Sequence, residues 1–179
     1  MLQKSSMSKI VNLFFIYPNK EMYLTQISKY VKIAHTSVKN NLDILLNKGI
    51  ITEKIDRKGK RNYPIYKANI NSEIYKKYKK LLNYSQIIES GLIEFLEDSI
   101  MPRSIVLFGS YQKGEDIEDS DIDLFVESSA KKVDLSKFEK IFKRKIQIHF
   151  NENFNSYSKE LKNNIINGVI ISGYLEVIK

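Results

Sequence analysis

The sequence contains no cysteine, which excludes disulfide bonds and thiolate metal sites. It also lacks a segment with the length and hydrophobicity of a membrane span. The apolar part of residues 1–16 includes an asparagine and ends without a small-residue cleavage site, so we do not expect a signal peptide. With 42% hydrophobic residues among 179, the chain has enough apolar content for one or two small folded domains. We expect a cytoplasmic protein with no membrane partner.

Positive charge is confined to the first part of the sequence. Residues 1–70 hold 13 lysine and arginine residues against four acidic residues, a net charge of +9. Residues 71–99 carry a net charge of −1, and residues 100–179 are neutral overall. Basic charge gathered in one segment is typical of a surface that binds a polyanion, and we expect double-stranded DNA as the partner. Charge alone does not decide this, because many soluble proteins are mildly basic.

A short apolar run in the second half of the chain leads into a candidate phosphate-binding turn. Residues 104–108 predict a buried strand that ends at Gly109 and Ser110. Glycine lets the backbone come close to a ligand, and serine adds a hydroxyl group beside the N–H groups that open the next helix. The sequence therefore predicts a phosphate site at this turn.

Two aspartates accompany a second predicted strand, residues 122–126. Asp121 and Asp123 are separated by one residue, and the period of two along a strand places both carboxylates on the same face. Carboxylates at this spacing repel each other unless a cation lies between them. A divalent ion, Mg²⁺ or Mn²⁺, carrying the phosphates of a nucleoside triphosphate is the candidate. The alternative is an acidic loop without a ligand.

The string GSYQKGEDIEDSDIDLF, residues 109–125, resembles the signature of the polymerase β-type nucleotidyltransferase superfamily, and most of all its small "minimal" members. The resemblance implies a small mixed-sheet domain with the element order β-α-β-α-β-α. It also implies that Asp121 and Asp123 hold the metal while Gly109 and Ser110 hold the β- and γ-phosphates. The implied reaction transfers a nucleotidyl group to an acceptor hydroxyl and releases pyrophosphate.

One position departs from the pattern of this superfamily. Its active members add a third carboxylate from the following strand, which is expected here at residues 145–150, and Gln147 occupies that position. A glutamine carbonyl can touch a metal ion but brings no charge and cannot take a proton, so the ion that activates the acceptor should bind more weakly. His149 lies two residues on, on the same face, and is a candidate general base. A surface histidine at a strand end is the alternative.

The first part of the chain has helical apolar spacing in three stretches. We predict helices at residues 7–17, at 26–32 with Thr25 as the N-cap, and from an N-cap at Thr36 or Ser37 to residue 48, where Gly49 ends the third helix. Residues 51–67 then predict a two-stranded hairpin. Its tip places four cations around a glycine: Arg57, Lys58, Lys60 and Arg61.

This order of elements resembles the winged helix-turn-helix of bacterial and archaeal regulators. The resemblance implies that the third helix enters the major groove of DNA and that the hairpin tip contacts phosphates. The implied contacts from the third helix are Thr36, Ser37, Lys39, Asn40 and Asn41. A winged helix used for protein contact is the alternative.

We expect an α+β protein in three parts: a winged helix-turn-helix at residues 1–70, a helical linker at 71–100 and a nucleotidyltransferase-like mixed-sheet domain at 101–179. The linker shows two helical stretches with a break at Tyr84 and Ser85, and it could pack between the domains or pair with a second copy. The last elements expected are a helix at residues 135–143, the strand at 145–150, a helix at 156–166 and the closing segment 168–173.

Two functions fit this sequence. The first is a DNA-binding enzyme that transfers a nucleotidyl group from a nucleoside triphosphate. The second is a winged-helix regulator, or an antitoxin-like protein, whose nucleotidyltransferase domain is a catalytically impaired nucleotide sensor. Minimal nucleotidyltransferases often act with a separate helical partner protein, so such a partner is a further expectation.

Overall fold

The computed structural model of the chain describes residues 5–151 and 154–177, with Asn155 described by its backbone alone. The chain divides into two compact units, Met1–Lys79 and Lys80–Lys179. Helices and two sheets are present together, which confirms the expected α+β class. Within the described residues, no helix is long and apolar enough to cross a membrane.

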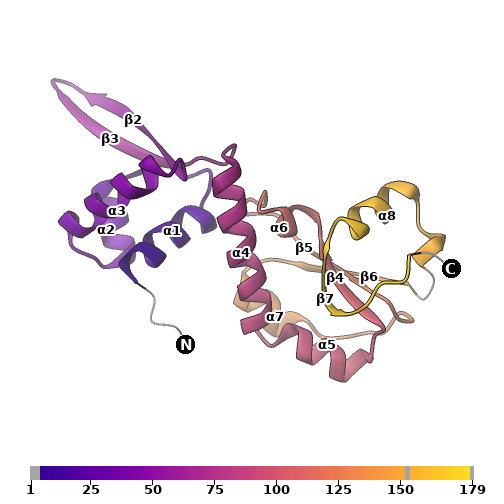
Figure 1. Cartoon of the computed structure of the whole chain (residues 1–179). Coiled ribbons are helices and arrows are strands. Elements are labelled where there is room, and N and C mark those ends of the chain that lie inside the picture. The colour runs from indigo at the N-terminus through magenta and orange to yellow at the C-terminus, as the bar shows by residue number, and fades with distance from the viewer. Residues whose placement is uncertain (1–4, 152–153, 178–179) are drawn as a thin grey trace. The chain divides into compact units, whose positions relative to one another are not determined.

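The described part of the first unit contains three complete helices, the start of a fourth and a small antiparallel sheet (Figure 1). Its sheet has the strand order β1-β3-β2, so the strand between the first two helices pairs with the second strand of the hairpin. The elements are α1 (Ser6–Ile16), β1 (Met22–Tyr23), α2 (Leu24–Val31), α3 (His35–Asn47), β2 (Ile51–Lys58) and β3 (Arg61–Ala68).

Apolar residues at helical spacing form the core of this unit. Ile10 and Phe14 on α1 are completely buried, as are Val38 and Leu42 on α3. The expected helices are confirmed, but two of the expected caps are wrong. The helix α2 begins one residue before Thr25, where the backbone N–H of Tyr23 donates to the Gln26 side chain at 2.9 Å. The helix α3 has Ala34 as its N-cap, so Thr36 and Ser37 lie in its first turn. The N-cap residues are Tyr23 and Ala34, and neither offers a short side-chain acceptor. The preference of short polar side chains for the N-cap therefore did not predict where these two helices begin.

The hairpin extends beyond the helices of its unit (Figure 1). Its two strands pair without interruption from Ile51 opposite Ala68 to Lys58 opposite Arg61. Gly59 has a φ of 62° at the turn, a backbone conformation that glycine adopts without strain. The tip predicted from the four cations is therefore confirmed as the end of a two-stranded ribbon.

The second unit is built on a four-stranded sheet with the order β6-β5-β4-β7. Neighbouring strands are antiparallel except β5 and β6, which are parallel. Its elements, after the helix α4 (Glu73–Glu89), are α5 (Leu92–Ile100), β4 (Ser104–Phe108), α6 (Gly109–Lys113), β5 (Ile122–Val126), α7 (Ser136–Phe142), β6 (Ile146–Phe150), the 3₁₀ turn η1 (Phe154–Ser156), α8 (Lys159–Ile166) and β7 (Val169–Gly173).

The expected order of elements in this domain ended on a helix. The structure has a further strand, β7, after that helix, so the expected order is wrong at its end. The strand β7 pairs antiparallel with β4. All five residues of β4 are buried, so its backbone groups would lack partners if it formed an edge of the sheet. The backbone of β7 supplies those partners.

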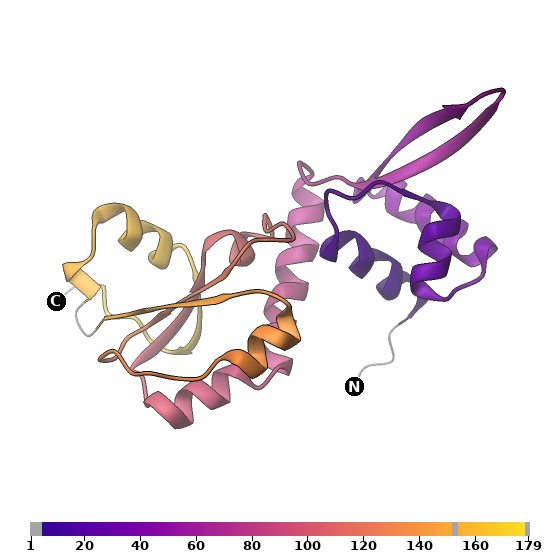
Figure 2. The ribbon, with the colours of Figure 1, turned by 180° about the vertical axis from the view of Figure 1, so that it is seen from behind.

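Helices cover both faces of this sheet. Ile105 and Leu107 of β4 pack on the face that carries α5 and α7. Val106 and Phe108 pack on the other face with Ile165 of α8. Figures 1 and 2, which view the molecule from opposite sides, show α8 away from α5 and α7.

The helix α4 (Glu73–Glu89) runs through the boundary of the two units. The break between α4 and α5 lies at Ser90-Gly91, so the expected break at Tyr84 and Ser85 is wrong. Ser85 stays helical and donates to Glu89 along the helix surface at 3.1 Å. Gly91 has a φ of 75°, and the Ser90 hydroxyl accepts from the backbone N–H of Leu92 at 3.1 Å, which starts the new helix.

Candidate functional site

Asp121 and Asp123 lie at the start of β5, on the side of the sheet where β4 ends. Asp121 directly precedes the strand and Asp123 is its second residue, so their side chains share one face. In the antiparallel pairing of β4 with β5, Asp123 stands opposite Phe108, the last residue of β4. The turn that begins at Gly109 therefore lies beside the Asp123 carboxylate.

Gly109 is required at this turn for two reasons. Its φ of 76° lies in the left-handed region that disfavours residues with a Cβ atom. A Cβ atom built on Gly109 would also collide with Oδ2 of Asp123. The missing side chain is therefore what allows the turn and the carboxylate to lie together. Ser110 follows in α6 and is partly exposed.

The strand β6 brings Gln147 and His149 to the same place. In the parallel pairing of β5 with β6, Gln147 stands next to Asp123. The Gln147 side-chain amide donates a hydrogen bond to Oδ2 of Asp121. His149 Nε2 lies 3.9 Å from Oδ1 of Asp123, and its ring packs edge-on against Phe108 with centroids 5.3 Å apart. Gln147 thus hydrogen-bonds to Asp121, and both Gln147 and His149 lie beside Asp123.

Burial raises the pKa of Asp123 above its ordinary value. The Asp121 charge adds to this rise, and the nearby His149 opposes it. A carboxylate whose ionised form is disfavoured by its surroundings and by a second carboxylate gains stability from a bound cation.

The predicted contacts on α3 divide into exposed and inward-facing residues. Thr36, Lys39 and Asn40 are exposed, and Ser37 is half-buried. Asn41 is 9% exposed, and its amide donates to the backbone carbonyl of Ser37 at 2.6 Å. The structure therefore places Asn41 with the core of the unit and away from the surface on which the other residues lie.

The same surface of α3 carries residues that the sequence analysis did not select. Asp43 is exposed, and Ile44 is 45% exposed. Their positions, three and four residues after Asn40, are the signal that could have identified them, because residues at this spacing share a helix face.

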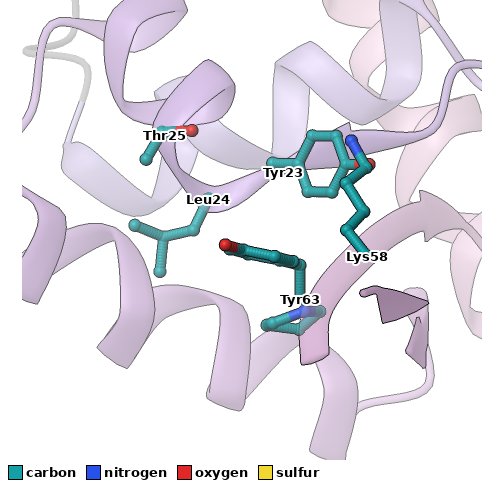
Figure 3. A pocket seen from close by; sticks show the side chains of 6 residues that line it. Tyr23, Leu24, Thr25, Lys58 and Tyr63 are labelled. Atoms are coloured by element: carbon teal, nitrogen blue, oxygen red, sulfur yellow. The ribbon is translucent and has the colours of Figure 1, made fainter. Parts of the chain in front are cut away.

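All four cations at the hairpin tip are exposed, but Lys58 turns back toward the body of the unit. Its ammonium group lies 4.7 Å from the centre of the Tyr23 ring and 3.7 Å from the Asp56 carboxylate. Figure 3 shows Lys58 beside Tyr23, with Tyr63 facing Leu24. These side chains line an open pocket of about 410 Å³ together with Thr25 and Pro64.

One comparison with known proteins matches residues of the second unit. A family model described as a nucleotidyltransferase domain matches residues 89–171. Residues 89–171 form a nucleotidyltransferase domain. A solved structure described as a possible transcriptional regulator from Methanosarcina mazei Go1 is 18% identical over 52% of this chain and 79% of that chain, with a TM-score of 0.38. A likeness at this TM-score carries no conclusion. The curated proteins compared with the chain include no match.

The nucleotidyltransferase domain offers a divalent ion two carboxylates. Oxygen ligands are those that Mg²⁺ prefers, and Asp121 and Asp123 supply them from one face of the sheet. In the described part of the chain, no group of three or more acidic or histidine side chains is arranged to hold an ion. Asp121 and Asp123 are therefore the two carboxylates of this site that a divalent ion could use as ligands.

The sequence analysis also missed two residues of the nucleotidyltransferase domain. Asp116 and Arg144 form an ion pair of 2.8 Å, and both side chains are at least nine-tenths buried. Asp116 lies within the motif and Arg144 begins the segment that contains Gln147. The sequence shows only that these two residues have opposite charges and lie in or next to motif segments. Their contact depends on how the loop and strand β6 pack together, which the sequence does not show.

Proposed function

We propose that the nucleotidyltransferase domain binds a nucleoside triphosphate with Mg²⁺ or Mn²⁺ through Asp121 and Asp123 and transfers its nucleotidyl group to an acceptor hydroxyl. The observation that carries the proposal is the position of the two carboxylates, on one face of β5, beside a turn whose Gly109 has no room for a side chain. Such a turn lets phosphate groups approach the backbone where the metal ligands lie.

The proposed chemistry depends on positioning and on charge neutralisation. A divalent ion, when bound, offsets the charge of the phosphates and of the attacking oxygen. Asp121 and Asp123 would hold this ion, while Gly109 and Ser110 would orient the β- and γ-phosphates. The acceptor oxygen forms a bond to the α-phosphorus, and the bond between that phosphorus and the oxygen that links it to the β-phosphorus breaks. Pyrophosphate leaves, and the acceptor proton passes to a base. His149, whose Nε2 is 3.9 Å from Asp123, is the candidate for that base.

Calorimetric titration tests the metal-binding step. Asp121→Asn combined with Asp123→Asn removes two charges at nearly constant shape, so folding should survive while the Mg²⁺-dependent affinity for the triphosphate falls. A control variant, Asp98→Asn with Glu160→Gln, removes the same charge at two exposed positions outside the motif and should keep the parental affinity. Equal affinities in all three proteins would mean that the Asp121–Asp123 pair is only a solvated strand end.

We further propose that the first unit is a winged helix that binds double-stranded DNA. The order α1-β1-α2-α3-β2-β3 and the sheet order β1-β3-β2 support this fold. The net charge of +9 on residues 1–70 supports a polyanionic partner. Within the unit, exposed polar residues of α3 and the exposed cations of the hairpin tip are available for a groove and for phosphates.

A salt-dependence measurement tests DNA binding. Replacing Lys58, Lys60 and Arg61 with alanine should weaken binding to all duplexes alike and flatten the salt slope, by about 0.9 for each phosphate that the protein no longer neutralises. The control removes equal charge from three exposed lysines of the nucleotidyltransferase domain, Lys132, Lys137 and Lys159. A parent protein that shifts no duplex, its own promoter region included, would make the first unit a protein-contact module.

A second candidate function is a regulator whose nucleotidyltransferase domain senses nucleotides without turning them over. The observation that favours it is Gln147, whose amide occupies the place beside Asp123 and hydrogen-bonds to Asp121. An amide brings no charge to a metal site. An antitoxin-like protein with a separate helical partner belongs to the same alternative. Triphosphate binding without pyrophosphate release would favour it.

A further inference from the structure

A buried ion pair lies next to the proposed metal site and has no part in the proposed chemistry. Oδ2 of Asp116 and Nη2 of Arg144 are 2.8 Å apart, and the two side chains are 1% and 10% exposed. Burying two charges carries a large desolvation penalty, and apolar residues in their place are often as stable. Fold stability alone is therefore a poor explanation for the pair.

The guanidinium group of Arg144 also holds the loop that leads to Asp121. Its Nη1 donates to the backbone carbonyl of Ser120 at 2.8 Å and to that of Ile117. These carbonyls bracket a turn that is closed by the Ser120 N–H, which donates to Ile117 at 3.1 Å. The turn ends one residue before Asp121. One planar side chain, two residues before β6, thus fixes both ends of this turn.

The carboxylate of Asp116 extends the network to the turn at Gly109. Its Oδ1 accepts a hydrogen bond of 2.8 Å from the side-chain amide of Asn83. The same amide donates to the backbone carbonyl of Tyr111 in α6, also at 2.8 Å. The Arg144 guanidinium lies 5.7 Å from the centre of the Tyr111 ring. The segment after Gly109, the loop before Asp121 and the start of β6 are therefore tied together.

We infer that Asp116 and Arg144 are positioning residues of the nucleotidyltransferase site, which fix the Asp121 carboxylate in the geometry that a divalent ion requires. The inference rests on the proposed function, because it acts through the metal ligand Asp121. Mg²⁺ demands nearly ideal octahedral geometry, and ligand groups must be held to within about 0.5 Å. Neither side chain of the pair is among the proposed metal or phosphate ligands.

The substitution Arg144→Lys separates the charge of this residue from its geometry. Lysine keeps a positive charge beside Asp116, but one ammonium group does not reproduce a planar fork with three acceptors. The matched control is Arg103→Lys. Arg103 pairs with Glu127, whose side chain is 7% exposed, at a distance of 3.7 Å and at the end of β4 away from Gly109.

Two measurements compare these variants at a temperature at which circular dichroism shows them folded. In the metal-free proteins, hydrogen exchange of the peptide that covers residues 115–122 should be faster in Arg144→Lys and unchanged in Arg103→Lys. The Kd of the Mg²⁺-triphosphate complex should rise at least about tenfold in Arg144→Lys, as is usual when a partner of a metal ligand is altered, and stay parental in the control. If Arg144→Lys does not fold, the nearly isosteric Asp116→Asn replaces it with the same expectations.

A double-mutant cycle with Asp121→Asn distinguishes positioning from general weakening of the fold. Arg144→Lys should produce no further loss of affinity when Asp121→Asn is present, because both substitutions act through the same carboxylate. A lower Tm of Arg144→Lys with parental exchange and parental affinity would overturn the inference and leave a purely structural pair. Parental affinity of Asp121→Asn itself would overturn the proposed metal site, and this inference with it.

Discussion

The substitution Gly109→Ala tests whether the turn and Asp123 depend on each other as the structure indicates. Alanine at a φ of 76° is strained, and holding a residue with a Cβ atom in this region costs about 1–2 kcal/mol. The added methyl group also meets the Asp123 carboxylate, which must then leave its rotamer at a cost of about 0.5–1.5 kcal/mol. We expect a total loss of about 1.5–3.5 kcal/mol.

Gly91→Ala is the matched control for the backbone part of this loss. Gly91 lies in the same unit with a φ of 75°, and a Cβ atom built there meets nothing within 4 Å. Backbone strain should therefore destabilise both variants, and only Gly109→Ala should also be destabilised by the displacement of Asp123. For a domain of about 100 residues, 1 kcal/mol corresponds to roughly 4–8 °C in Tm, so thermal unfolding resolves the difference.

Binding separates the two variants more sharply. Gly91→Ala should keep the Mg²⁺-dependent affinity for the triphosphate, and Gly109→Ala should lose most of it, because Asp123 is displaced. In the background of Asp123→Ala, the two glycine substitutions should destabilise the protein equally. Equal stability and equal affinity of Gly109→Ala and Gly91→Ala in the parent would refute the argument that the turn makes room for the carboxylate.

Three further predictions address other parts of the chain. Gln147→Asp places a third carboxylate beside Asp121 and Asp123, so calorimetry should show tighter binding of a second divalent ion, and a chelator should lower the Tm relative to the parent. Burial raises the folded-state pKa of Asp123 above 3.8, so the free energy of unfolding of the metal-free protein should fall as pH rises through that pKa. Asp123→Asn should therefore raise the Tm at pH 7 in chelator. A lower Tm of this variant would contradict the argument. Asn41→Ala should lower the Tm without changing DNA specificity, whereas Asn40→Ala should change specificity in a binding-site selection with little change in Tm.

Patterns local to one strand or turn predicted the second unit well. The apolar run before Gly109 and the alternation around Asp123 correspond to β4 and β5, because burial and period two act within a few residues. The place of Gln147 beside the aspartates was also predictable from the superfamily pattern. The two strands depend on short-range spacing along the chain, whereas the place of Gln147 rested on the resemblance to the superfamily.

Features that depend on packing between distant segments were not predictable. Asn41 follows Ser37 by one helical turn and bonds to it, but only the fold shows that this face of α3 is buried. The pairing of β7 with β4 needed knowledge that β4 would otherwise form an exposed edge. The contact of Asp116 with Arg144 joins residues 28 positions apart, and neither has a spacing pattern that indicates the other.

Release of pyrophosphate tests the central claim, nucleotidyl transfer by this domain, most directly. The purified protein is incubated with each nucleoside triphosphate, Mg²⁺ and nucleic-acid or protein acceptors from a cell extract, and the label from the α-phosphate is followed together with pyrophosphate. We predict that label transfer and pyrophosphate appear in equal amounts, require the divalent ion and are lost in the Asp121→Asn, Asp123→Asn variant. Transfer that persists in this variant, or triphosphate binding with neither transfer nor pyrophosphate in the parent, would contradict the account.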